Sequence, residues 1–134
     1  MNIKPKVGVV SCSGECCSLG TLSRVATRIV IEELQNQTVT ICLPLFLAGE
    51  TSEHGFAKEH PTISVDGCGK LCAMKAISKY SKKPAESVNV EELLKEWGTE
   101  APKSRRVFDE DDMKIAMRLA NILAERVDAI HEAS

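Results

Sequence analysis

Short runs of β-branched residues alternate along this chain with segments of helical periodicity, and this alternation strongly limits its fold. Four such runs predict strands, over residues 7–11, 39–43, 62–65 and 87–90. Apolar residues at helical spacing predict helices over residues 21–35, 72–80 and 91–97. Repeated strand–helix units favour a parallel sheet, because a connection between parallel strands needs room for a crossover helix.

We therefore expect an α/β fold, with residues 1–134 forming a single, cysteine-rich, metal-binding domain of three layers. Its open, mainly parallel sheet would have about four strands, with helices on both faces. The 134 residues suit one domain, and the 43% hydrophobic composition can fill its core. A last helix is expected after a cap at Asp109, with Met113 and Met117 on its apolar face.

Charge and hydropathy argue against several classes of function. The formal net charge is -2 and no basic stripe is present, so we expect no binding to nucleic acid or anionic membranes. No apolar run reaches the ~20 residues that a membrane span needs. The first residues lack the apolar segment of a signal peptide, so we expect a cytoplasmic protein. Disulfides are not maintained there, and cysteine clusters then indicate metal binding or catalysis.

The chain has six cysteines, most of which follow a predicted strand at once. They are Cys12, Cys16 and Cys17 after the first strand, Cys42 at the end of the second, and Cys68 and Cys72 after the third. The carboxyl ends of parallel strands meet at one edge of a sheet, so we expect these thiols to converge. All six are therefore candidate metal ligands.

Zinc is the expected metal, because Zn²⁺ favours four ligands in a tetrahedron and binds thiolates well. Cys68 and Cys72 are four residues apart, so they would share one face if both were at the start of a helix. Cys12 and Cys16 have the same spacing, with Cys17 as a competitor. For Cys42 alone, the role of a small buried hydrophobe is an almost equally good explanation.

Three other residues could each have one of two roles. Asp66 can cap the following helix or orient a metal ligand, and capping is the commoner role. His54 and His60 lie in the segment 44–61, which is expected to be irregular apart from a helical turn near residues 53–58. They could complete a mixed cysteine and histidine site, although solvated loop histidines are commoner.

Three cysteine motifs, each placed after a predicted strand, resemble the DGC family, which is named for its Asp-Gly-Cys motif and associated with zinc binding. The motifs are Cys12-Ser13-Gly14, Cys42-Leu43-Pro44, and Asp66-Gly67-Cys68 followed by Cys72. The resemblance spans residues 7–90 and implies an α/β domain with a cysteine-lined metal site. The implied ligands are Cys12, Cys42, Cys68 and Cys72. Glu15 and an extra cysteine lengthen the first motif, which leaves open whether Cys16 or Cys17 faces the site.

Residues 9–18 also resemble the phosphate loop of low-molecular-weight tyrosine phosphatases and related arsenate reductases. In those enzymes, an arginine six residues after the nucleophilic cysteine clamps the oxyanion. The sixth residue after Cys12 is Ser18, and Arg24 is expected to lie on the following helix. A bidentate guanidinium is hard to replace, so we do not expect phosphatase activity.

Three classes of function remain, and whether the protein is an enzyme stays open. The favoured one is a cysteine-thiolate protein that binds Zn(II) at the carboxyl edge of the sheet. The second is a thiol-dependent redox or sulfur-transfer enzyme that uses Cys12 or Cys17 as nucleophile. The third is a small iron–sulfur protein, since four thiolates can also hold a cluster. The apolar residues 43–47 leave a protein partner or a homo-oligomer open.

Overall fold

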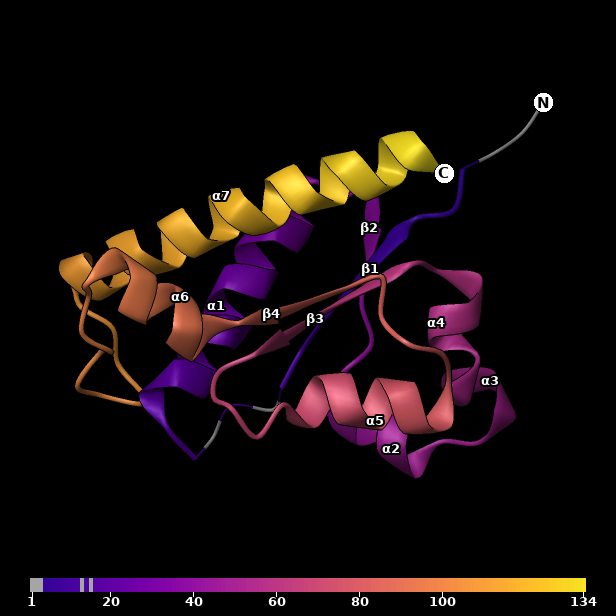
Figure 1. Cartoon of the computed structure of the whole chain (residues 1–134), viewed down its shortest axis with the longest axis horizontal. Coiled ribbons are helices and arrows are strands. Elements are labelled where there is room, and N and C mark those ends of the chain that lie inside the picture. The colour runs from indigo at the N-terminus through magenta and orange to yellow at the C-terminus, as the bar shows by residue number, and fades with distance from the viewer. Residues whose placement is uncertain (1–3, 13, 15) are drawn as a thin grey trace.

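The computed structural model describes residues 4–12, 14 and 16–134, and four strands in them form one parallel sheet (Figure 1). The strands are β1 (Val7–Ser11), β2 (Thr38–Val39), β3 (Thr62–Asp66) and β4 (Glu86–Asn89). Their order is β2-β1-β3-β4, and each neighbouring pair is parallel. The predicted α/β class and parallel sheet are therefore confirmed.

Helices cover both faces of the sheet, as the sequence predicts (Figure 1). One face carries α1 (Ser18–Glu33), α6 (Val90–Trp97) and α7 (Glu110–Ala133). The other carries α2 (Leu43–Ala48), α3 (Thr51–His54), α4 (Phe56–Glu59) and α5 (Cys72–Tyr80). Right-handed crossovers explain the sides taken by α1 and by α2 to α5, because the chain moves from β1 to β2 in one direction and then to β3 and β4 in the other.

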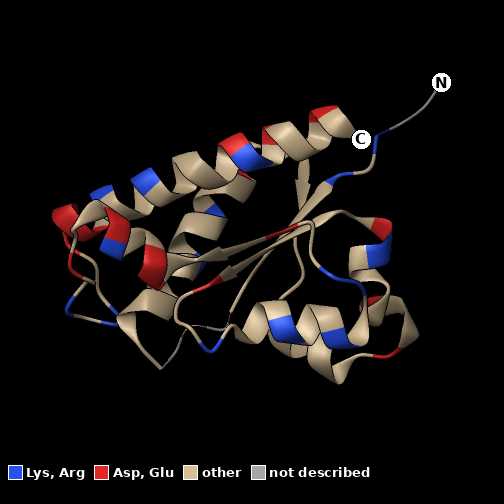
Figure 2. Cartoon of the chain, in the orientation of Figure 1, with Lys and Arg blue, Asp and Glu red and all other residues tan. Residues whose placement is uncertain are grey.

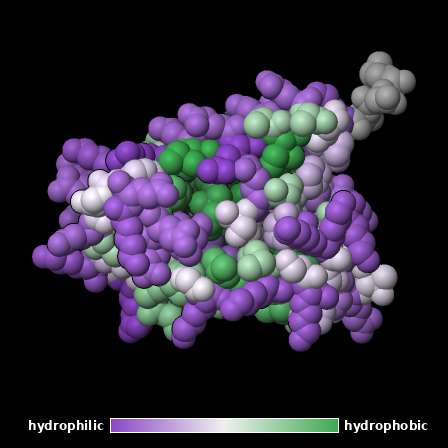
Figure 3. Space-filling view, in the orientation of Figure 1, coloured by the Kyte–Doolittle hydropathy of each residue, from purple (hydrophilic) through white to green (hydrophobic). Residues whose placement is uncertain are grey.

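A hydrophobic core lies on each face of the sheet. Val9 of β1 packs in the same cluster as Leu22 of α1 and Leu123 of α7. The next residue, Val10, belongs to the cluster on the other face, which contains Phe46 of α2. Successive side chains of a strand point to opposite faces, so this short apolar run contributes to both cores. Figure 3 shows apolar residues gathered along α7 and between α7 and α5.

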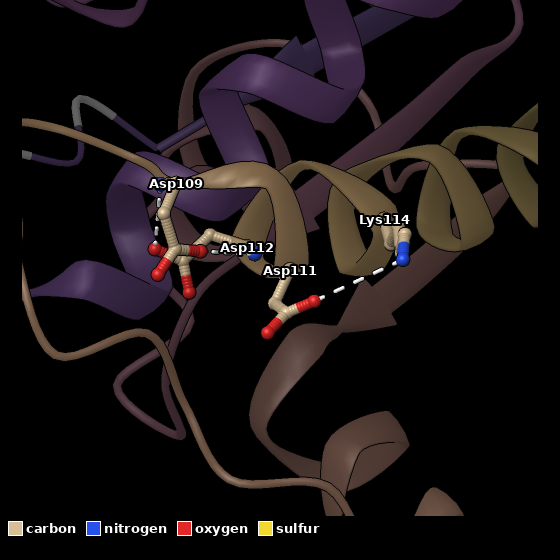
Figure 4. A network of polar contacts seen from close by, with 4 residues as sticks. All are labelled: Asp109, Asp111, Asp112 and Lys114. Carbon is tan, nitrogen blue, oxygen red and sulfur yellow. Dashed lines mark hydrogen bonds and ion pairs between the residues drawn. The ribbon is translucent and has the colours of Figure 1, made fainter.

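The start of α7 is held by a capping box, which confirms the predicted cap at Asp109 (Figure 4). The Asp109 carboxylate accepts a hydrogen bond from the Asp112 amide at 2.8 Å. The Asp112 carboxylate accepts one in return from the Asp109 amide at 3.0 Å. Asp111 also lies 3.9 Å from the Lys114 ammonium. These carboxylates also suit the positive end of the helix dipole.

The apolar face of α7 differs from the predicted one at its first turns. Met113 and Met117 are 38% and 40% exposed, whereas Leu119 is buried against the sheet side of the helix. Small Ala116 and Ala120 lie in the same core, where α7 crosses α1. The expectation that both methionines face the core is therefore wrong, since the contact with α1 centres on the alanines and leucines instead.

The strand predicted over residues 39–43 is shorter and begins one residue earlier. Only Thr38 and Val39 pair with β1. Thr40 leaves the ladder, and its hydroxyl donates to the Val9 carbonyl at 2.7 Å. Cys42 is the N-cap of α2, and Pro44 lies in the first turn, where the fixed φ of proline favours a helix. The expected irregular segment thus contains α2, α3 and α4.

Charged residues of both signs are interspersed over the face seen in Figure 2, including along α7. The 24 residues of α7 make it long, but acidic and basic side chains recur through it. Across the described parts of the chain, no helix combines the length and apolarity that a bilayer crossing requires.

Candidate functional site

The carboxyl ends of β1 and β3 lie side by side at one edge of the sheet. Ser11 pairs with Val65, and the Cys12 amide donates to the Val65 carbonyl at 3.0 Å, which extends the ladder by one residue. After this point α1 covers one face of the sheet, and α5 covers the other. Such a switch point is a common place for ligands in open α/β sheets.

Three glycines allow the loop after β1 and the turn after β3 to meet at the start of α1. A Cβ on Gly67 would lie 2.5 Å from the Gly20 nitrogen, and a Cβ on Gly20 would lie 2.5 Å from the Gly14 Cα. Gly14 also has a φ of 77°, which only glycine adopts without strain. Side chains at these positions would push the two cysteine-bearing segments apart.

Cys12 is half-buried just after β1 and has one defined polar partner. Its Sγ lies 3.3 Å from the Oγ of Ser23, a buried residue of α1. The Ser23 hydroxyl donates to the Gly20 carbonyl at 2.6 Å. Because a hydroxyl has a single hydrogen, the Cys12 thiol is the donor to Ser23 in this arrangement.

Cys42 lines the same cavity as Cys12. This cavity of about 400 Å³ lies between the end of β1, one face of α1, and residues 40–44. Arg24, Thr27 and Arg28 of α1 form another part of its wall. Arg24 lies on the helix, as expected, and nevertheless lines the cavity that contains Cys12. Two cysteines from different strand ends therefore border one space together with two arginines.

The other four cysteines lie next to helix starts. Cys17 is the half-buried N-cap of α1, and Cys16 before it is exposed. Cys68 is half-buried in the turn after β3, and exposed Cys72 is the first residue of α5. The condition under which Cys68 and Cys72 would share one helical face, that both lie at the start of the helix, is not met. Leu71, with a left-handed φ of 53°, separates the turn of Cys68 from the helix.

All six cysteines are free thiols, so their chemistry suits a soft or borderline metal. Within residues 4–12, 14 and 16–134, however, no three cysteine, histidine or acidic side chains are grouped closely enough to hold an ion. The sheet places the cysteine-bearing segments beyond the carboxyl ends of its strands, as predicted. It gives Cys12 and Cys42 a common cavity, but it does not assemble a complete ligand set from the described residues.

Asp66 of β3 caps α5 from outside the helix. Its carboxylate is 1% exposed and accepts hydrogen bonds from the amides of Ala73, at 2.7 Å, and Met74, at 3.1 Å. Burial raises the pKa of Asp66 above its ordinary value, and the two backbone hydrogen bonds oppose this rise. The predicted capping role is confirmed, so this aspartate fixes the turn that carries Cys68.

His54 and His60 pack against aromatic rings on the face covered by α2 to α5. The ring of His54 is 5.5 Å from that of Phe46 and stacks on Tyr80 at 5.0 Å. The ring of His60 is 5.2 Å from that of Phe56. In the described part of the chain, neither histidine joins a group of three or more potential ligands. Aromatic packing accounts for both positions.

Comparison with known families assigns the chain to a family. The family model of the DGC domain matches residues 8–126, which cover most of the chain. The chain belongs to the DGC domain family. The matched region of this DGC domain contains all six cysteines and Asp66. No curated protein and no solved structure matches the chain.

Four residues of α1 lie at the candidate site of this DGC domain although the sequence did not predict them there. These residues are Ser23, Arg24, Thr27 and Arg28. Ser23 and Thr27 are one helical turn apart and are both buried, although both are polar. The sequence feature that could have pointed to these residues is the helical spacing of polar residues beside an apolar face. That signal is weak, because serine and threonine hydroxyls in helices often bond only to the preceding turn.

Proposed function

We propose that this DGC-family protein binds zinc through cysteine thiolates at the carboxyl edge of its sheet. The observation that carries the proposal is the cavity shared by Cys12 and Cys42, two free thiols that follow different strands. Thiolates are strong zinc ligands, and the DGC assignment covers every cysteine of the chain. A bound ion would cross-link segments that the sheet alone holds through a few backbone contacts.

Cys12 and Cys42 would supply the first two ligands. Half-buried Cys68 and Cys17 are the preferred sources of the third and fourth, because ordering an exposed thiol costs more conformational entropy. Cys42 is also exposed, but it already lines the cavity that contains Cys12. The described residues contain no preformed group of three ligands, so binding requires a shift of the cysteine-bearing loops. Each thiol must also lose its proton, which makes the affinity depend on pH.

Metal analysis of the protein purified without oxygen tests this proposal. We expect about one zinc per chain and no visible absorption. Cys12→Ser and Cys42→Ser should each lose the metal, whereas exposed Cys16→Ser serves as the matched control and should retain it. Iron together with inorganic sulfide would replace zinc binding by an iron–sulfur cluster. Metal-free wild-type protein would refute the proposal.

A second candidate is thiol–disulfide chemistry, which the shared cavity of Cys12 and Cys42 favours. The Cys12 thiolate would attack a disulfide substrate, form a mixed disulfide with it and release the first substrate thiolate. The Cys42 thiolate would then attack the Cys12 sulfur of the mixed disulfide and release the second substrate thiolate. The products are a Cys12–Cys42 disulfide and two substrate thiolates. Incubation with oxidised glutathione, followed by peptide mapping, should then show that disulfide. Mixed disulfides spread over exposed Cys16 and Cys72 would argue against it.

A further inference from the structure

Two arginines line the cavity beside Cys12, and metal binding does not explain them. Arg24 and Arg28 of α1 both line it, four residues apart on one face of the helix. None of the described residues that line the cavity is acidic. Arg28 does pair with Glu32, at 3.6 Å, but both side chains are largely exposed, so this pair is weak and a ligand can compete with it.

A buried hydroxyl group in the cavity wall lacks a partner. Thr27 lines the cavity between the two arginines and is only 4% exposed. Its Oγ1 has no hydrogen-bond partner among the described residues, and such a group destabilises a fold unless something satisfies it. The other buried hydroxyls of α1 are satisfied, since Ser23 donates to Gly20 and Thr21 donates to the Gly14 carbonyl.

Apart from Ser11 and Thr40, the remaining wall of the cavity is apolar. Ile31 of α1, Ile41 and Leu43 contribute it. At about 400 Å³, the cavity has the volume of a small-molecule site. A ligand that fills it therefore needs an anionic head for the guanidinium groups and a short apolar body for the isoleucines.

We propose that this cavity binds a small organic anion, with a phosphonate, phosphate or carboxylate head between Arg24 and Arg28. Guanidinium groups bind such heads through paired hydrogen bonds, and the Thr27 hydroxyl donates a further one after rotation about χ1. The apolar body of the ligand lies against Ile31 and Ile41. The ligand occupies the space bordered by Cys12 and Cys42, so it shields these two thiols. This site does not depend on the metal.

Calorimetric titration of the full-length protein tests the site, both as purified and after chelator treatment. The probes are butylphosphonate, butyrate, inorganic phosphate and 1-butanol. We expect butylphosphonate or butyrate to bind about tenfold more tightly than inorganic phosphate, because the apolar wall buries the alkyl chain. The uncharged 1-butanol should not bind detectably. Binding by neither organic anion, or equal binding of 1-butanol, would overturn the proposal.

Three variants test the assignment of residues. Arg24→Gln and Arg28→Gln should each weaken binding of the organic anion about tenfold, and Arg106→Gln, an exposed arginine outside the cavity, should leave it unchanged. Thr27→Val keeps the side-chain shape and removes an unpartnered hydroxyl. It should therefore weaken binding about fivefold while thermal stability stays equal or rises. Undiminished binding by both arginine variants, or by folded Thr27→Val, would refute the site.

Thiol protection gives an independent readout. In the chelator-treated protein, saturating butylphosphonate or butyrate, whichever binds, should slow alkylation of Cys12 and Cys42 by iodoacetamide at least about fivefold, as measured by peptide mass spectrometry. Exposed Cys72, which does not line the cavity, should react at the same rate throughout. Equal protection of all three cysteines would place the anion elsewhere. Loss of metal in Cys12→Ser with intact anion binding would support both proposals and show that the anion site does not need the metal.

Discussion

The Sγ of Cys12 and the Oγ of Ser23 lie 3.3 Å apart, which ties the first cysteine of the DGC domain to helix α1. In the free protein the thiol donates, because the hydroxyl hydrogen of Ser23 is directed at the Gly20 carbonyl. A metal-bound thiolate can only accept. Ser23 would then have to rotate its hydrogen toward the sulfur, so the same contact can serve both states.

Ser23→Ala should weaken zinc binding by about tenfold, because it removes the donor that supports the Cys12 thiolate. It should also lower the free energy of unfolding of the metal-free protein by about 1 kcal/mol. Competition with a chromophoric chelator measures the affinity, and urea denaturation measures the stability. Ser87→Ala, at an exposed position of β4, is the control. An unchanged zinc affinity in the folded Ser23→Ala protein would show that Ser23 does not support the ligand.

Gly67→Ala should destabilise the protein by about 2 kcal/mol or more, because its Cβ would lie 2.5 Å from the Gly20 backbone nitrogen. Gly69→Ala is a matched control in the same turn. Its Cβ would meet only the Glu91 carboxylate, at 3.9 Å, so the unfolding free energy should change little. Urea denaturation measures the free energy of unfolding of both variants. Similar stability of the two variants would contradict the close packing of Gly67 on α1.

Asp66→Ala should destabilise the fold by about 1–2 kcal/mol at neutral pH, because the amides of Ala73 and Met74 lose their acceptor. Asp66→Leu is no substitute for this test, since it adds bulk to a buried site. Urea denaturation at pH 7, monitored through the fluorescence of Trp97, measures this change. A stability equal to that of the wild type would mean that water satisfies both amides.

The pH dependence of stability tests the environment of Asp66 directly. Burial raises its pKa in the folded protein, so the folded state holds the proton more tightly than the unfolded state. The resulting stability is fully present below about pH 4 and is lost as the pH rises through the raised pKa. The unfolding free energy of the wild type relative to Asp66→Asn should therefore be greater at pH 4 than at pH 7. The opposite trend would show that the two amide hydrogen bonds outweigh burial.

Glu86→Ala should lower the free energy of unfolding by about 1 kcal/mol, because Glu86 of β4 accepts a hydrogen bond from Arg126 of α7 at 2.6 Å. The two side chains are only 33% and 40% exposed, so salt screens this pair incompletely. The exposed pair of Arg28 and Glu32 is the control, and Glu32→Ala should change stability by less than about 0.5 kcal/mol. Equal effects would contradict a distinct contribution of Glu86.

Local sequence patterns predicted the elements of this fold well wherever one element buries its own apolar residues. β1 matches its predicted range, α5 begins and ends as expected, and Asp109 caps α7. The predictions failed where contacts with a neighbouring helix or strand determine the local structure. Thr40 leaves β2 because its hydroxyl bonds to Val9, and Met113 lies outside the core because Ala116 and Leu119 meet α1 and the sheet instead.

The candidate site shows the same limit. Six cysteines near strand ends were sufficient to predict a thiol-rich edge and the DGC family, since strand ends meet whenever the strands are parallel. The spacing of Cys68 and Cys72 did not predict that left-handed Leu71 would separate them. Arg24 and Thr27 could not be assigned to the cavity, because nothing in their local sequence says which neighbours α1 meets.

The sequence by itself determined the α/β class, the parallel strands and the position of the thiols after them, because these follow from periodicity and from residue types in short segments. Only the tertiary structure decided that Cys12 and Cys42 share a cavity while no three described ligands form a group. That outcome depends on the strand order β2-β1-β3-β4 and on the glycine contacts that seat α1. Both are long-range packing results, which a local pattern does not encode.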